Sequence, residues 1–340
     1  MKNKKCLMAV LALVLCVAML ATGCGNGKSG GNGQNGKMDP AQTLVLKVGD
    51  EEIYLNEMNF YALSFAQSYG IDENADLDAF YSADYPTMDD AYKSQFLIGV
   101  RQSKILYIKA VEEGITLTSE DEELVTQSMD KFRNMYGEDT LSGYGIDEDT
   151  LKKVCTEMQM VAKLQNKLSE SAQYEEEDYG SFYNIVLLTI EVDEDGNAVV
   201  DSDGNYIPLS DEKKDEQKAN AEEILARLKD GEDAEALIEE YKISDASSLL
   251  HATTESLTKT YGLKDGEISD IIDNDYGYKI VKIVSLHDED YTATVNEYNK
   301  SNASSEAVDA QMNAWFDEFV INEDDLDADV WAKFTFKDFV

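Results

Sequence analysis

Residues 276–286 read Tyr-Gly-Tyr-Lys-Ile-Val-Lys-Ile-Val-Ser-Leu, and this apolar, partly β-branched run predicts a strand. A similar run from Phe182 to Val192 lies earlier in the chain. Between the two, residues 211–231 and 232–241 have the composition of a charged helix and a shorter one. A strand, helices and a closing strand predict a compact α+β module, so the fold class is α+β.

The chain on either side of this module is predicted to be mainly helical. Residues 44–55 form a short hairpin around Gly49-Asp50, and Asn56 then caps a helix that extends to Tyr69. Thr87 and Asp90 have the spacing of a capping box at the start of the next helix. Further helices are expected at 119–136, from 149 or 150 to about 168, and at 295–319. The simplest organisation is a helical unit with the α+β module inserted into it.

The N-terminus predicts where the protein is located. A cationic start is followed by an unbroken apolar run from Cys6 to Leu20, which is shorter than the ~20 residues needed to span a bilayer. The following Ala21-Thr22-Gly23-Cys24 resembles a bacterial lipobox, which implies a lipid on Cys24 and a membrane-anchored protein outside the cytoplasm. The alternative is a soluble secreted protein in which Cys24 is incidental. Residues 25–42 are rich in Gly and Asn and predict a flexible tether.

Charge and cysteine content exclude several kinds of function. The chain has 69 acidic and 29 basic residues, and removal of the signal segment takes three lysines, so the formal charge changes from −40 to −43. Such a surface repels phosphate backbones, which excludes nucleic acid as a partner. Cys155 is the one cysteine left after the signal and Cys24, so no internal disulfide is possible. We expect it to be a small buried hydrophobe.

Short motifs in a fixed order resemble one family. They include Val48-Gly49-Asp50, Ile108 to Ile115, Gly145 to Lys152, Lys229 to Ala234, Leu263 to Ser269 and Tyr276 to Ile283. The set resembles the PrsA and SurA foldases, in which a parvulin-type peptidyl-prolyl isomerase module is carried by a helical chaperone domain. The resemblance implies a protein that acts on unfolded or partially folded secreted polypeptides and needs no cofactor or metal.

The resemblance also gives domain boundaries. They are a lipoprotein signal peptide at 1–23, a tether at 24–42, the first part of the helical chaperone domain at 43–178, the parvulin-like module at 179–290 and a returning helix and tail at 291–340.

Two positions of this chain depart from the parvulin pattern. The family's His-Ile-Leu-Val strand corresponds to Asn184-Ile185-Val186-Leu187, and its Gly-Tyr-His-Ile-Ile strand corresponds to Gly277-Tyr278-Lys279-Ile280-Val281. Asn184 and Lys279 therefore occupy the two histidine positions, and a Gly-Gly-Asp-Leu-Gly-like segment is missing between Ser244 and Gly262. The sequence favours a degenerate module kept for client binding. The alternatives are an active prolyl isomerase and a ligand-binding lipoprotein that serves a transporter.

Other polar signals have simpler explanations. The acidic turns at 193–197 and 201–205 have Gly as their fourth residue, whereas a calcium-binding EF-hand loop needs Gly as its sixth, so we expect hairpin turns. The acidic run 175–178 predicts a solvated hinge. His251 and His287 are isolated in sequence, and His251 is the better candidate for a residual role because it lies in the shortened segment.

Overall fold

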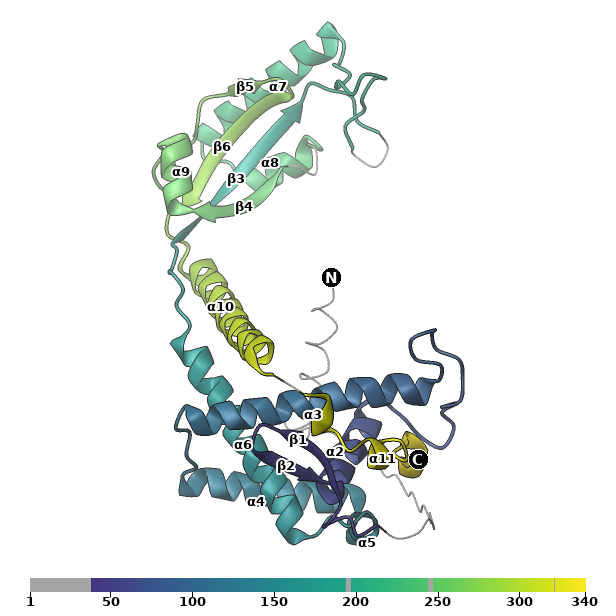
Figure 1. Cartoon of the computed structure of the whole chain (residues 1–340). Helices are drawn as coiled ribbons and strands as arrows, with labels where there is room; N and C mark the ends of the chain where they lie inside the picture. The colour runs from purple at the N-terminus through teal and green to yellow at the C-terminus, as the bar shows by residue number, and fades with distance from the viewer. Residues whose placement is uncertain (1–37, 194–196, 244–246, 321) are drawn as a thin grey trace. The chain divides into compact units, whose positions relative to one another are not determined.

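A computed structural model describes residues 38–193, 197–243, 247–320 and 322–340 (Figure 1). It divides into two units, which we call the helical unit and the sheet unit. Among the described residues, the helical unit takes in 38–172 and the segment from Ser304 to Val340, and the sheet unit lies between Gln173 and Ala303. The predicted signal segment and Cys24 lie outside the described residues. Within the described residues, no helix is both long enough and apolar enough to cross a membrane.

The helical unit begins with the predicted hairpin and continues through five helices. Its elements are β1 (Leu44–Val48), β2 (Glu51–Tyr54), α2 (Leu55–Ser68), α3 (Met88–Glu112), α4 (Ser119–Tyr136), α5 (Glu138–Gly143), α6 (Glu148–Ser171), η1 (Glu323–Asp325), α11 (Ala328–Trp331) and η2 (Phe336–Phe339). The boundary between the units falls inside α10 (Glu289–Glu318). The predicted mixture of helix and sheet is confirmed.

Helix starts in this unit follow local capping chemistry. Thr87 and Asp90 form the predicted capping box at α3, in which each residue's side chain bonds the other's backbone N–H. The prediction that Asn56 caps α2 is wrong, because α2 follows β2 directly and its cap position is Tyr54. Asn56 lies in the first turn instead, and its side-chain amide donates to Thr150 Oγ1 of α6 at 2.7 Å. The residue therefore links two helices.

The C-terminal tail completes the core of the helical unit. Phe336 is fully buried, and its ring lies 5.0 Å from that of Phe65 on α2 and 5.4 Å from that of Phe96 on α3. Phe334 stacks on Phe96 with a centroid separation of 5.4 Å. Residues 330–336 read Val-Trp-Ala-Lys-Phe-Thr-Phe. In the structure this segment supplies aromatic side chains to a core whose other buried residues come mainly from residues 45–164.

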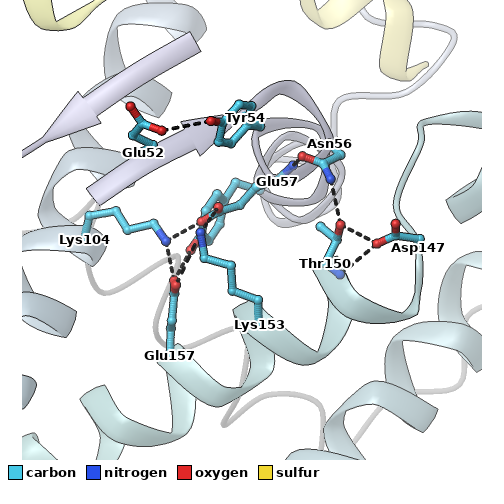
Figure 2. A network of polar contacts seen from close by, with 10 residues as sticks. Glu52, Tyr54, Asn56, Glu57, Lys104, Asp147, Thr150, Lys153 and Glu157 are labelled. Atoms are coloured by element: carbon cyan, nitrogen blue, oxygen red, sulfur yellow. Dashed lines mark hydrogen bonds and ion pairs between the residues drawn. The ribbon is translucent and has the colours of Figure 1, made fainter. Parts of the chain in front are cut away.

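A buried ionic cluster joins three helices of this unit (Figure 2). The ammonium group of Lys104 on α3 is fully buried and contacts the carboxylates of Glu57 on α2 and Glu157 on α6. Lys153 reaches the same carboxylates from a half-exposed position, with its Nζ 2.9 Å from Glu57 and 3.9 Å from Glu157. An isolated charge in a protein interior costs several kcal/mol, so the lysine and the two glutamates depend on one another.

The sheet unit is built on one antiparallel sheet with the strand order β4-β3-β6-β5. Both predicted strands are present, although β3 ends at Leu188, before the predicted Val192. Beyond it, isolated bridges join Ile190 to Pro208, Val192 to Ala198 and Val200 to Tyr206. The elements are β3 (Tyr179–Leu188), α7 (Asp211–Lys229), α8 (Ala234–Glu240), β4 (Ser248–Thr253), α9 (Thr254–Tyr261), β5 (Ile272–Asn274) and β6 (Gly277–Ser285).

The two faces of the sheet are covered differently. On one face, Ile185 and Ile280 are buried with Ile224 of α7 and Leu237 of α8. On the other face, α9 places Leu257 over a smaller group of buried side chains, namely Phe182, Val281 and Ile283. Helix α9 therefore covers one end of the second face. The candidate functional site described below lies on the rest of that face.

The buried cluster makes a pH-dependent prediction. Burial raises the pKa of Glu157 from 4.5 to about 7, although Lys104 opposes this rise. The folded state holds the Glu157 proton more tightly than the unfolded state does. Protonated Glu157 therefore makes its full contribution to the unfolding free energy below about pH 4.5, and this contribution declines as the pH rises to about 7. Relative to Glu157→Gln, the wild type should lose on the order of 3 kcal/mol of unfolding free energy over that interval.

Urea titrations between pH 4.5 and pH 8 measure this difference. Tryptophan fluorescence reports on the helical unit, since Trp315 and Trp331 both lie in it. Glu148→Gln is the matched control, because Glu148 is an exposed residue of the same helix, and its profile should run parallel to that of the wild type. If the unfolding free energy of the wild type varies with pH in parallel with that of Glu157→Gln, the raised pKa of Glu157 is contradicted.

Candidate functional site

Asn184 and Lys279 lie on the same face of the sheet. In the β3–β6 register, Asn184 is opposite Val281 and Val186 is opposite Lys279. Directly opposed residues share a face, as do residues two apart along a strand. Asn184 and Lys279 are therefore diagonal neighbours across the central strand pair. The face they share is the one that α9 covers at one end.

Neighbouring strands extend this face in both directions. Ser248 of β4 lies opposite Asn184, and Ile272 of β5 lies opposite Lys279. Leu250 of β4 is 39% exposed and Ile272 is 37% exposed, so apolar surface remains open on both sides. We call this surface the Asn184–Lys279 face and define it as Asn184, Val186, Ser248, Leu250, Ile272 and Lys279.

The Lys279 side chain is held by an aromatic residue of α9. Its ammonium group donates to the hydroxyl oxygen of Tyr261 at 2.7 Å and lies 5.0 Å from the centre of that ring. The ring of Tyr261 in turn lies 6.0 Å from that of Phe182. An ammonium group can only donate hydrogen bonds, whereas a neutral imidazole can donate at one nitrogen and accept at the other. Position 279 therefore offers a fixed positive donor, and it cannot accept a hydrogen bond while charged.

Gly277 has a structural role in this motif. Its φ of +155° is rare for residues with side chains, and a Cβ there would lie 2.1 Å from the carbonyl oxygen of Leu187. Glycine thus permits the close approach of β6 to β3 at the end of the strand pair. Two residues later, the same pairing places Lys279 opposite Val186. The backbone conformation at position 277 and its close contact with β3 therefore explain why this position is a glycine.

His251 does not join this site. It pairs with Ser181, an odd number of residues from Asn184, so it lies on the opposite face of the sheet. Its ring stacks on Tyr291 with a centroid separation of 3.7 Å, and its Nε2 lies 3.4 Å from a carboxylate oxygen of Asp288. His251, the better candidate for a residual role, therefore lies away from Asn184 and Lys279.

The second histidine, His287, follows β6 and contacts a residue near the start of the sheet unit. His287 contacts the carboxylate of Asp178 through Nδ1, and the side chains of both residues are largely exposed. Asp178 belongs to the acidic run 175–178, which forms neither helix nor strand. The neighbouring Glu177 is bonded through its backbone to the side chain of Asn296. This segment thus has specific contacts within the sheet unit.

The remaining reactive or acidic candidates have structural roles. Cys155 is buried on α6, and burial raises the pKa of its thiol to about 12, so the thiol is unreactive at neutral pH. In the acidic turns, Asp193 accepts from the backbone of Asn197 at 2.8 Å, and Asp201 accepts from that of Asn205 at 2.9 Å. Among the described residues, no group of three or more His, Cys, Asp or Glu could hold a metal ion.

The segment before Gly262 contains structure that the sequence analysis missed. Residues 248–253 form β4 and residues 254–261 form α9, which together supply Ser248, Leu250 and Tyr261 to the site region. Signals for the helix were present. Thr253 caps it by accepting from the backbone of Ser256, and Gly262 ends it with a φ of +63°.

Comparisons with known proteins give matches among solved structures. No family model matches the chain, and no curated protein matches it. The peptidyl-prolyl isomerase PrsA from Bacillus cereus matches with 15% identity over 78% of this chain and 99% of its own, with a TM-score of 0.30. PrsA from Bacillus subtilis matches with 15% identity over 76% and 99%, and a TM-score of 0.24. The foldase protein PrsA from Streptococcus pneumoniae matches with 15% identity over 88% and 100%, and a TM-score of 0.24. These are structures of the family that the sequence motifs resemble.

Proposed function

We propose that the chain is a membrane-anchored, extracytoplasmic foldase or holdase that binds unfolded secreted polypeptides. In this proposal the module at 179–290 is a degenerate parvulin-like domain inserted between the helical segments 43–178 and 291–340. One observation carries the proposal. The Asn184–Lys279 face combines open apolar side chains with hydrogen-bonding groups, but neither histidine of the parvulin pattern is present.

The Asn184–Lys279 face suits reversible binding of an extended peptide. It spans all four strands, and the strand order places β4 at one edge of the sheet. An edge strand can pair with a further strand through backbone hydrogen bonds, which provide affinity. Side-chain contacts on the face of the sheet make some peptide sequences bind better than others. Leu249 and Leu250, on opposite faces of β4, are 45% and 39% exposed. This combination favours binding with little dependence on the exact client sequence.

Efficient isomerase chemistry is less well supported. Rotation about a peptide bond has a barrier of about 18–20 kcal/mol, and an enzyme must stabilise the twisted amide more strongly than the planar one. Such stabilisation depends on donors directed at the charge that develops during rotation. At position 279 the ammonium group is already bonded to Tyr261 and has no accepting lone pair. Client binding therefore accounts for the site with fewer assumptions than catalysis.

The charge of the chain supports the choice of clients. A formal charge of −43 after removal of the signal keeps the protein soluble and attracts cationic unfolded segments. It also opposes adsorption to anionic lipid headgroups, so attachment to the membrane would depend on the lipid at Cys24.

The anchor can be tested separately. Cys24→Ala removes the proposed lipid attachment, so the protein should move from the membrane fraction to the soluble extracytoplasmic fraction. Immunoblotting of the two fractions measures this shift, and Cys155→Ala is the control that keeps Cys24. Retention in the membrane fraction of a Cys24→Ala protein whose signal segment has been removed, as judged by its size on the blot, would exclude lipid anchoring at this residue.

Chaperone activity is tested by light scattering. The purified chain from Gly25 onward should suppress aggregation of reduced, cationic lysozyme at a near-stoichiometric ratio, and it should suppress aggregation of an acidic client less well. An equally acidic protein with no chaperone activity controls for crowding and charge. Failure to suppress aggregation of either client would overturn the proposed function.

A proline-limited peptide assay separates the proposed function from catalysis. We expect no acceleration above the uncatalysed rate, and therefore no difference between the wild type, Asn184→Ala and Lys279→Ala. An active parvulin serves as the positive control. Clear wild-type activity that is lost in both variants would show that the module is an active isomerase.

A further inference from the structure

A hairpin between α2 and α3 displays three exposed aromatic side chains. Phe80 is 78% exposed, Tyr81 is 55% exposed and Tyr85 is 39% exposed. Phe80 bridges to Thr87, and the backbone N–H of Ser82 donates to the carbonyl oxygen of Tyr85 at 2.9 Å. The aromatic display is therefore part of an ordered turn. We call residues 80–87 the aromatic hairpin, and it lies at the N-terminal end of α3 (Figure 1).

An open pocket of about 520 Å³ lies beside this hairpin. Its apolar lining comes from Tyr85 and Pro86 of the hairpin, Leu97 of α3 and Trp331 of α11. The ammonium group of Lys93 lies 5.3 Å from the centre of the Trp331 ring and donates to the Trp331 carbonyl oxygen at 3.3 Å. The volume falls within the range of about 300–1,000 Å³ that is usual for ligand sites. Two aromatic rings thus line a recess next to exposed aromatic surface.

The surrounding sequence is strongly acidic. Residues 71–92 contain no Lys, Arg or His, and their acidic residues are Asp72, Glu73, Asp76, Asp78, Asp84, Asp89 and Asp90. Lys337 forms an ion pair with Asp78, and Lys93 is hydrogen-bonded to the Trp331 carbonyl oxygen. Basic residues outside 71–92 therefore neutralise only part of the negative charge of this segment. The charged residues on the wall of the pocket are Asp84, Asp90 and Lys93, so the wall carries more acidic than basic groups. Charge complementarity therefore favours a cationic partner over a second copy of this acidic chain.

We propose that the aromatic hairpin and its pocket bind an extended polypeptide segment in which an apolar or aromatic side chain is flanked by lysine or arginine. The apolar side chain enters the pocket between Tyr85 and Trp331, and Phe80 and Tyr81 contact the adjoining residues. The flanking cations lie near Asp84 and its acidic neighbours. The inference rests on the proposed function for the source of the segment, but the site belongs to the helical unit and uses neither Asn184 nor Lys279.

Fluorescence anisotropy of a labelled peptide tests this proposal with the full chain from Gly25 onward. The probe is Lys-Lys-Leu-Phe-Leu-Lys-Lys, and its anionic match is Glu-Glu-Leu-Phe-Leu-Glu-Glu. The double variant Phe80→Ser/Tyr81→Ser should bind the cationic peptide about 10-fold more weakly, since exposed aromatic anchors dominate such contacts. Tyr298→Ser is the matched control, because Tyr298 is an aromatic residue of α10 with 66% exposure, and its affinity should stay within about twofold of wild type.

A second measurement locates the bound peptide. In the Trp315→Phe protein, Trp331 is the one remaining tryptophan, so peptide binding in the pocket should change its emission in a saturable way. Circular dichroism establishes that each variant retains its fold. Equal affinity of the double variant and the wild type, equal binding of the anionic peptide, or an unchanged Trp331 emission at saturation would each overturn the proposal. So would a wild-type dimer that the double variant converts to a monomer, because the occupant would then be a second copy.

The outcome is separable from that of the proposed function. If the double variant still suppresses lysozyme aggregation and the peptide does not bind near Trp331, this site is excluded and the holdase proposal stands. If the wild type does not suppress aggregation but binds the cationic peptide with the expected losses, the site stands and the holdase proposal fails.

Discussion

The helical unit depends on the burial of one ammonium group. Lys104 has no solvent access, so Glu57 of α2 and Glu157 of α6 must both lie beside its position on α3. Apolar contacts tolerate small shifts of one helix along another, whereas a buried ion pair loses most of its benefit when one partner moves away. The cluster therefore constrains how the three helices pack. The aromatic core made with Phe336 and the pocket beside Trp331 are built on the same helix, α3, at its other end.

The sheet unit depends on a different constraint, namely the register of β3 with β6. The close approach at Gly277 and the pairing of Val186 with Lys279 place Asn184 and Lys279 diagonally across one face. Moving the register by one residue would send these side chains to opposite faces. The chemistry available on that face is consequently that of an amide and a lysine held by Tyr261.

Local signals were sufficient to predict much of the fold. The capping box of Thr87 and Asp90 is confirmed, as is the helix from Ser119 to Tyr136, because these features depend on residues within one or two turns. Helix α3 packs against α2, α6 and β1. The strand β4 was missed because its short run Ser248–Thr253 is half-exposed at a sheet edge and lacks a regular alternation. The helix α9 was missed although Thr253 and Gly262 mark its ends.

The sequence by itself determined the α+β class, the main helices and strands, the acidic character of the chain and the presence of Asn184 and Lys279 in the two segments that resemble the parvulin pattern. Tertiary structure alone decided that Lys104 is buried between two glutamates, that Tyr261 holds Lys279, and that His251 faces away from Asn184. It also decided that Trp331 completes a pocket with residues more than two hundred positions earlier in the chain. The physical reason is the distance along the chain over which each interaction acts. Propensity, capping and periodicity act between residues a few positions apart, whereas burial, ion pairing and ring contacts depend on which distant segments the folded core brings together.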